Sequence, residues 1–261
     1  YKIELENFAA DQYLRLGDPL IHEIDVYFVS DSGLIRHSRS GASLAFEKRE
    51  VNVSDYYFLL PQGSCTSYIR LKKKDNFQCP LSIASFKCLM EKEHRNNLVF
   101  GLYFGILFVL IFYNLFIYSS IKEKSYLYYI FYLCFLILAT ATLQGVSFEY
   151  LWPNRPYFNL HLPSFGVMMF VFAALFVTSL LKIKIYLPKL TKGFYVFIGI
   201  AILVIIINLF RPIIGTGVLK FTGAMFSVFL ILVGIQSYLK GAKVAKLFLW
   251  AGSFYLLSII I

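Results

Sequence analysis

The stretch LVFGLYFGILFVLIFYNLFIYS, Leu98–Ser119, decides the fold class of this chain. It holds no charged residue, and 15 of its 22 residues are Leu, Ile, Val or Phe. As a helix it would extend roughly 33 Å at a rise of about 1.5 Å per residue, which is enough to cross the hydrocarbon core of a bilayer. Gly101 and Gly105 have the small-xxx-small spacing that lets transmembrane helices pack closely. The sequence therefore predicts a membrane-spanning helix here.

Similar apolar runs fill the rest of the chain and predict more spans. They cover Tyr126–Ser147, Leu162–Leu181, Phe194–Phe210, Ile213–Leu239 and Leu247–Ile261. The composition agrees, because 58% of all residues are apolar and only 15% are charged, against about 25% charged in an average soluble domain. We expect a polytopic helix bundle over residues 98–261, with five full spans and part of a sixth. A purely soluble enzyme, a disordered chain and a disulfide-dense mini-protein are excluded.

Before residue 98 the pattern changes to short runs in which apolar and polar residues alternate, as in half-buried strands. The predicted strands are Lys2–Glu6, Gln12–Leu16, Glu23–Ser30, Leu34–His37, Val51–Leu59, Thr66–Lys72 and Phe77–Ala84. About seven strands without a helical period indicate an antiparallel β-sandwich over residues 1–90. The polar stretch 91–97 is interpreted as a connector into the membrane domain.

The net charge of +10 lies entirely in the apolar part of the chain. Residues 1–97 hold 13 basic and 13 acidic residues, whereas residues 98–261 hold 12 basic residues against Glu123 and Glu149. Three loops, 121–125, 182–192 and 240–246, carry nine lysines, and the alternate loops carry only Arg155 and Arg211. By the positive-inside rule the lysine-rich loops are cytoplasmic, which places the sandwich outside. Such a distribution reports membrane orientation, so no nucleic-acid partner is expected.

Catalytic, cofactor and metal sites are not indicated. The sequence has no HExxH, GxSxG or Walker motif, and His22, His37, His94 and His161 lack the spacing of metal ligands. Lys220 is the one basic residue within a predicted span, and we interpret it as a side chain that snorkels to the interface. The neutral polar residues in or near the spans are expected to form hydrogen bonds between helices. They are Asn114, Gln144, Asn208 and Gln236.

Three of the four cysteines, Cys65, Cys79 and Cys88, lie in the predicted outer part. A hairpin of Thr66–Lys72 with Phe77–Ala84 would bring Cys65 near Cys88, so this is the favoured pair if a disulfide forms, with free thiols the preferred alternative.

The basic stretch Arg70–Lys74 is interpreted as a solvated strand edge and not as an anion site.

A carbohydrate ligand would require aromatic rings exposed on one face of a sheet. Tyr56, Tyr57 and Phe58 are adjacent, so alternate members must face the core. The sequence does not tell which rings lie outside, and the ligand-binding residues stay unassigned.

Three segments carry a resemblance to a known family. They are EIDVYFVSDSGLIRHSRSG (Glu23–Gly41), GLYFGILFVLIFYNLFIYSSIKEKSYLYYIFYLCF (Gly101–Phe135) and GVSFEYLWPN (Gly145–Asn154). Over roughly residues 20–160 the chain resembles the bacterial seven-transmembrane receptors with diverse intracellular signalling modules. The resemblance implies a periplasmic jelly-roll sandwich similar to carbohydrate-binding modules, then seven helices and a cytoplasmic kinase, cyclase or phosphatase. The sandwich of about 90 residues is short for this pattern, and the seventh span and output module lie outside the sequence given.

The resulting hypothesis is the sensory part of a signal-transduction receptor in the bacterial inner membrane, with no enzymatic activity in this fragment. The expected partners are the lipid bilayer, an extracytoplasmic ligand for which a carbohydrate is the first candidate, and a second copy of the chain. The alternative is a transporter or channel subunit with an extracytoplasmic domain. Broken helices or charges near the membrane midplane would favour that alternative, and the predicted spans show neither.

Overall fold

The computed structural model describes residues 1–8, 11–30, 33–73, 80–210, 216–242, 245, 246 and 248. The chain divides into two compact units. The first comprises residues 1–105 and 138–162, and the second comprises residues 106–137 and 163–261. The first unit holds a β-sandwich with the segments that contact it, and the second holds most of the apolar helices.

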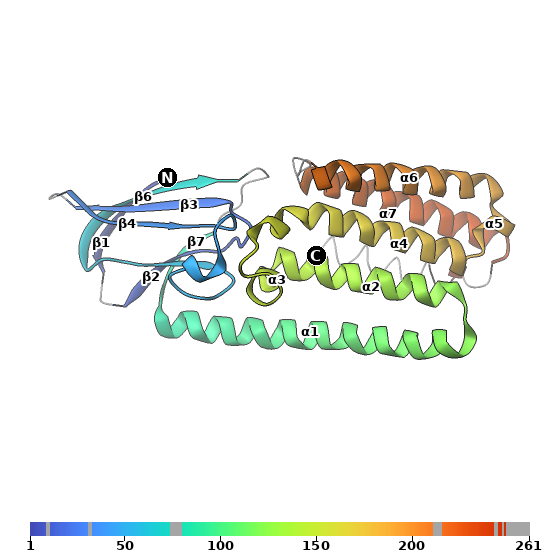
Figure 1. Cartoon of the computed structure of the whole chain (residues 1–261), viewed down its shortest axis with the longest axis horizontal. Helices are drawn as coiled ribbons and strands as arrows, with labels where there is room; N and C mark the ends of the chain where they lie inside the picture. The colour runs from blue at the N-terminus through green and yellow to red at the C-terminus, as the bar shows by residue number, and fades with distance from the viewer. Residues whose placement is uncertain are drawn as a thin grey trace. The chain divides into compact units, whose positions relative to one another are not determined.

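The sandwich consists of two antiparallel sheets, drawn as two layers of arrows in Figure 1. The four-stranded sheet has the order β1-β6-β3-β4, and the three-stranded sheet has the order β5-β2-β7. The strand bounds are β1 Lys2–Phe8, β2 Gln12–Leu16, β3 Glu23–Ser30, β4 Gly33–Ser40, β5 Tyr56–Leu59, β6 Gly63–Lys72 and β7 Leu81–Ser85. The predicted β-region is therefore confirmed.

The core of the sandwich is built by the alternation that the sequence shows. In β3, Ile24, Val26 and Phe28 are fully buried while the residues between them are only partly covered. They pack with Leu14 and Leu16 of β2 in one apolar cluster between the sheets. Because apolar area buried from water is worth about 25 cal/mol per Å², this cluster fixes which face of each strand is inside.

Two strand predictions in this region are wrong in detail. The hairpin considered for Thr66–Lys72 and Phe77–Ala84 does not form, because β6 pairs with β1 and β3 while β7 pairs with β2 in the other sheet. Residues 74–79 lie outside the described residues. The predicted strand Val51–Leu59 is a strand only over Tyr56–Leu59, because the residues before it form turns around Arg49, described below.

The basic stretch Arg70–Lys74 begins at the end of β6. Its first three residues pair with β3 on one side, whereas the described pairing of β1 with the other side of β6 covers Gly63–Tyr68 and stops before Arg70. Arg70 and Lys72 point outward, and Lys73 forms an ion pair with Asp18. Lys74 lies outside the described residues. Within the described residues, Arg70–Lys72 therefore have a paired strand on one side only, and the interpretation of this stretch as a strand edge stands.

The helix α1, Phe86–Ile121, is continuous through the stretch predicted as a separate connector. It begins five residues before that stretch, directly after β7. No Gly or Pro interrupts residues 86–100, so nothing in the sequence breaks the helix between its polar start and the apolar run. The 36-residue helix is about 54 Å long, which exceeds the thickness of a bilayer core and leaves its polar first turns outside the apolar run.

The remaining helices are α2 Lys124–Leu143, α3 Val146–Tyr150, α4 Leu162–Leu180, α5 Ile183–Tyr186, α6 Pro188–Phe210 and α7 Thr216–Leu239, with short 3₁₀ helices η1 Phe46–Lys48 and η2 Pro156–His161. In the described part of the chain, five helical segments are long and apolar enough to cross a membrane. The second span ends at Leu143, four residues earlier than predicted, because Gly145 adopts a left-handed conformation. The predicted sixth span falls almost wholly outside the described residues.

Aromatic contacts hold the helices of the second unit together. Phe170 of α4 lies 5.5 Å from Phe226 of α7 between ring centroids, and Phe194 of α6 lies 4.6 Å from Phe229 of α7. Gly223 on α7 provides the space for Phe170, since a Cβ atom there would lie 2.8 Å from the ring. Pairs of this kind contribute about 0.5–1.5 kcal/mol beyond their buried area.

Candidate functional site

The first turns of α1 pack against the outer face of the three-stranded sheet. Phe86 lies 6.0 Å from Tyr13 of β2 between ring centroids. Leu89 is only 1% exposed, and Glu93 contacts Tyr57 of β5. Positions 86, 89 and 93 lie on one face of a helix. This face therefore joins the sandwich to the helix that continues into the first span.

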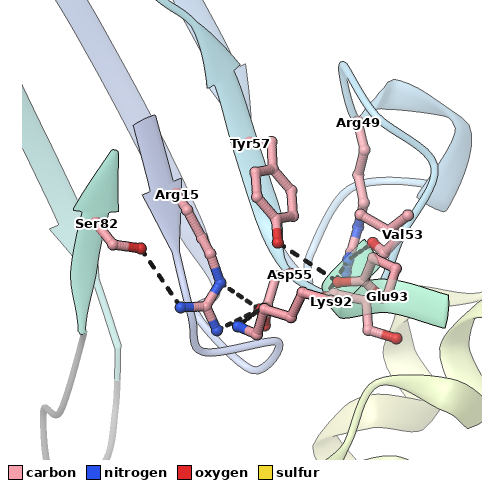
Figure 2. Close-up of polar contacts among 9 residues, drawn as sticks. Arg15, Arg49, Val53, Asp55, Tyr57, Ser82, Lys92 and Glu93 are labelled. Carbon is pink, nitrogen blue, oxygen red and sulfur yellow. Dashed lines mark hydrogen bonds and ion pairs between the residues drawn. The ribbon is translucent and has the colours of Figure 1, made fainter. Parts of the chain in front are cut away.

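A charged cluster links the sheet to α1 at the centre of this contact (Figure 2). Arg15 of β2 donates from Nε and Nη2 to Oδ2 of Asp55 at 2.7 and 2.6 Å. Lys92 of α1 approaches the same oxygen at 3.5 Å. One carboxylate thus binds one cation from the sheet and one from the helix. Burial alone would lower the pKa of Arg15, but its attraction to Asp55 outweighs burial and raises it.

Tyr57 adds a second contact to the helix. Its hydroxyl donates to Oε1 of Glu93 at 3.4 Å, and both side chains are buried (Figure 2). Burial raises the pKa of the Tyr57 hydroxyl, and the carboxylates of Asp55 and Glu93 raise it further. The hydroxyl therefore stays protonated at neutral pH and serves as a hydrogen-bond donor.

Arg49, just after η1, is the most deeply buried cation of the site. Its Nη1 donates to the carbonyl oxygens of Val53 at 2.7 Å and Ser54 at 2.5 Å, and its Nη2 lies 3.2 Å from the Tyr56 hydroxyl. The guanidinium carbon also lies 4.3–5.4 Å from the ring centroids of Phe46, Tyr56 and Phe148. Burial lowers the pKa of Arg49, opposed by Tyr56, Glu149 and Asp55, but an arginine keeps its charge at any physiological pH.

The segment 145–161, which connects α2 to α4, docks on the same side of the sandwich. The amide of Phe46 donates to the carbonyl of Pro153 at 3.0 Å, and the Phe46 ring meets Phe148 edge-to-face at 5.5 Å. Asn159 donates to the carbonyl of Ala42 at 3.4 Å and accepts a bond from the Trp152 indole at 2.9 Å. The sandwich thus contacts the membrane domain through a second segment besides α1.

Gly145 lets this segment approach the sandwich closely. It has a φ of +77°, and an added Cβ would lie 2.8 Å from Cβ of Pro19 and 3.3 Å from Cβ of Ser54. Only glycine adopts this backbone conformation without strain, and only glycine leaves room for Pro19. Gly145 is therefore both the residue before α3 and the point at which the segment 145–161 lies against Pro19 and Ser54.

The polar contacts tie two separate segments to the sandwich. Arg15 and Lys92 bind Asp55, and Arg49 donates to backbone carbonyls, which favours one defined packing of these segments. Among the residues that the structure describes, no group of three or more His, Cys, Asp or Glu side chains could hold a metal ion.

The histidines and cysteines named in the sequence analysis lie at separate places in the structure. His37 pairs with Asp25 at 3.3 Å on the four-stranded sheet, His94 is exposed on α1, and His161 contacts Tyr157. Cys65 and Cys88 are free thiols, the first buried and the second exposed. The Cys65–Cys88 pair, the less preferred alternative to free thiols, is not formed because the β6–β7 hairpin that would bring the two residues together is absent. Cys79 lies outside the described residues.

The polar residues of the spans have different partners. Asn208 of α6 donates to Ser164 of α4 at 2.9 Å, as the prediction of interhelical bonding requires. Asn114 instead donates to the carbonyl of Leu110 in its own helix. Gln144 follows the end of α2, Gln236 is exposed on α7, and the side chain of Lys220 lies outside the described part.

The sequence reasoning missed Arg49, Asp55 and the docking segment 145–161. Arg49 and Asp55 stand singly in a strand-poor stretch, and their partners lie up to about 100 positions away in the chain. The sequence held one signal for this site. The isolated Arg49 has aromatic residues on both sides of it in the chain, namely Phe46, Tyr56 and Tyr57.

Two family models match consecutive parts of the chain. The model described as 7TM diverse intracellular signalling matches residues 96–261, which is more than half of the chain. The model described as 7TMR-DISM extracellular 2 matches residues 1–85. Neither the curated proteins nor the solved structures gave a match.

Proposed function

Since the chain belongs to the family of seven-transmembrane receptors with diverse intracellular signalling, we propose that it detects a ligand outside the cytoplasm and passes the signal to a cytoplasmic output module. The membrane receptor region is the part that the family models cover. The ligand and the output module are the proposed parts. The first candidate for the ligand is a carbohydrate, and the receptor is proposed to act as a homodimer.

The continuity of α1 is the observation that carries this proposal. One helix face packs on the sandwich at Leu89 and Glu93, and the same helix continues without a break into the apolar run that begins at Leu98. A shift of the sandwich therefore acts directly on the first span. A ligand can drive such a shift only by binding one of two packing states more tightly than the other.

The segment 145–161 supports the proposed orientation. It contacts the sandwich through Phe46 and Ala42, so both lie on the same side of the membrane. The nine lysines lie in the loops that alternate with this segment along the chain, and the positive-inside rule assigns those loops to the cytoplasm. We place the sandwich outside the cytoplasmic membrane of a bacterial cell.

A helix-breaking insertion tests the coupling. Two glycines inserted after Asn97 in the full receptor should uncouple the packed turns of α1 from the spanning turns, because each glycine costs a helix about 1 kcal/mol relative to alanine. The output activity should then lose its dependence on the sandwich. The matched control is the same insertion after Gln62, in the exposed turn between β5 and β6. Equal output and equal ligand response in both variants would contradict the proposal.

The orientation is tested by cysteine labelling in whole cells. In a background without native cysteines, a cysteine placed at residues 182–192 should resist a membrane-impermeant thiol reagent. One placed at residues 154–159 should react once any outer membrane is permeabilised. The opposite pattern would overturn the orientation.

A further inference from the structure

Two lysine-rich loops of the second unit contribute buried side chains to one apolar cluster. The loop between α4 and α6 supplies Ile183 and Leu187, and the loop after α7 supplies Ala242 and Ala245. All four residues are at most 5% exposed. Because α6 begins after the first loop and α7 ends before the second, two successive spans lead away from one end of the unit and back to it. The fold therefore places both loops at the same end.

The lysines of this end have few acidic residues available within their own unit. The exposed lysines of the two loops, among the residues that the structure describes, are Lys182, Lys184, Lys192, Lys240 and Lys246. Glu123 is the only acidic residue in the sequence of the second unit, and it lies between two lysines of its own loop. The positive charge of this end is therefore left for a partner outside the unit.

The short helix α5 places an apolar side chain among these cations. Ile183 is fully buried, whereas Lys184 is exposed and Ile185 is 73% exposed. The amide of Ile185 donates to the carbonyl of Lys182 at 2.8 Å, and the amide of Leu187 donates to the carbonyl of Ile183 at 2.7 Å. Burial on one side and these bonds hold the helix so that Ile185 faces outward beside the lysines.

The position of α5 along the chain sets its depth in the membrane. The helix α4 ends at Leu180 and α6 begins at Pro188, so α5 lies between the ends of two spans (Figure 1). The ends of transmembrane helices lie at the level of the lipid headgroups. A lysine there reaches the phosphates, and an isoleucine there reaches the first methylene groups of the acyl chains.

We propose that α5 and the loop 240–246 form a binding site for an acidic phospholipid. The ammonium groups of the lysines pair with the phosphate oxygens of the headgroup, and Ile185 packs against the upper part of the acyl chains. This site is separate from the extracytoplasmic ligand of the proposed function. It would hold the α4–α6 turn at one leaflet of the membrane.

The combination of charge and apolar surface favours a lipid over the other anionic partners. A soluble phosphate compound would pair with the lysines but leave Ile185 in water. An acidic protein segment is less suited, because lysine is depleted in protein–protein interfaces. An acidic phospholipid supplies both the negative charge and the apolar chains.

The experiment measures lipid binding to the full chain in mixed micelles by native mass spectrometry. The probes are phosphatidylglycerol and phosphatidylcholine with identical acyl chains. We expect phosphatidylglycerol to bind about tenfold more tightly, since each lysine near an anionic lipid surface contributes about fivefold. The preference should weaken as salt is raised. Glycerol 3-phosphate, which has the phosphate without the chains, should not displace the lipid at equal concentration, and equal competition by it would overturn the lipid assignment.

Two matched pairs of substitutions separate a site from general charge. Lys182→Gln with Lys184→Gln should reduce the preference to about twofold or less. Lys122→Gln with Lys124→Gln is the control, because both pairs are exposed and begin at a residue of positive φ, +47° and +59°, but the loop 121–125 contributes nothing to the apolar cluster described above. The control pair should keep the preference. An equal loss in both pairs, or no loss in the first, would overturn the inference.

Two further variants test the remaining parts of the site. Lys182→Arg with Lys184→Arg keeps both charges and should keep the preference, so its loss would show that the first pair acts through the fold and would overturn the inference. Ile185→Ser should weaken the binding of both lipids and leave their ratio unchanged. Unchanged binding of both lipids in Ile185→Ser would overturn the proposed contact with the acyl chains.

Discussion

Replacement of Arg49 by alanine should open the sandwich where it meets the segment 145–161. The substitution leaves the carbonyls of Val53 and Ser54 without their donor and removes the cation that three aromatic rings surround. Charge-assisted hydrogen bonds contribute about 1.5–3 kcal/mol each and a buried cation–π contact about 2 kcal/mol. The cost of burying the charge offsets part of this sum. We expect a net loss of about 3 kcal/mol in the free energy of opening.

The buried thiol of Cys65 provides the assay. It is 7% exposed within the core of the sandwich, so a thiol reagent reaches it only when the sandwich opens. In a chain whose other cysteines are replaced by serine, the labelling rate divided by the rate in denaturant gives the opening equilibrium. A loss of about 3 kcal/mol corresponds to a labelling rate roughly a hundredfold faster for Arg49→Ala.

Two further variants define the outcome. Lys48→Ala removes the neighbouring but exposed cation and should change the labelling rate less than about twofold, as expected for surface charges. Arg49→Lys should be intermediate, because an ammonium group keeps the charge but cannot present the planar fork of donors. If Arg49→Ala labelled at the rate of Lys48→Ala, the argument that this cation holds the region together would be refuted.

Three other predictions concern single contacts. Burial raises the pKa of Tyr56 to about 12, whereas a tyrosine in the unfolded chain titrates near 10. The protonated hydroxyl therefore stabilises the folded state fully below pH ~10, and this stabilisation falls by about 2 kcal/mol as the pH rises toward 12. Denaturation followed by circular dichroism should show this loss of stability at alkaline pH, and Tyr56→Phe should reduce it. Gly145→Ala should destabilise the fold by about 1–3 kcal/mol and lower the midpoint of thermal unfolding, because φ at this position is +77° and Pro19 occupies the space that the added Cβ would need. An unchanged midpoint would show that the segment 145–161 relaxes freely. Asn208→Leu removes the hydrogen bond to Ser164 and should destabilise the helices by about 0.5–1.5 kcal/mol. The free energy of unfolding in mixed detergent measures this effect, and a gain in stability would contradict the role of the bond.

The sequence determined the membrane spans and the existence of the strands, because both are local properties. A run such as Leu98–Ser119 must leave water whatever surrounds it, and its length alone matches a bilayer. The alternation in Glu23–Ser30 likewise predicts a half-buried strand without reference to its partner. The lysine distribution predicts orientation on the same local basis.

Only the tertiary structure decided which strands pair and which side chains meet. Strands β6 and β7 are neighbours in sequence but belong to different sheets, because pairing depends on contacts made across the whole sandwich. Tyr57 and Tyr68 both alternate outward, yet α1 covers the first and leaves the second exposed. The docking of 145–161 around Arg49 joins segments about 100 residues apart. No periodicity encodes such contacts, since they arise only when two separately predicted elements bury each other's surfaces.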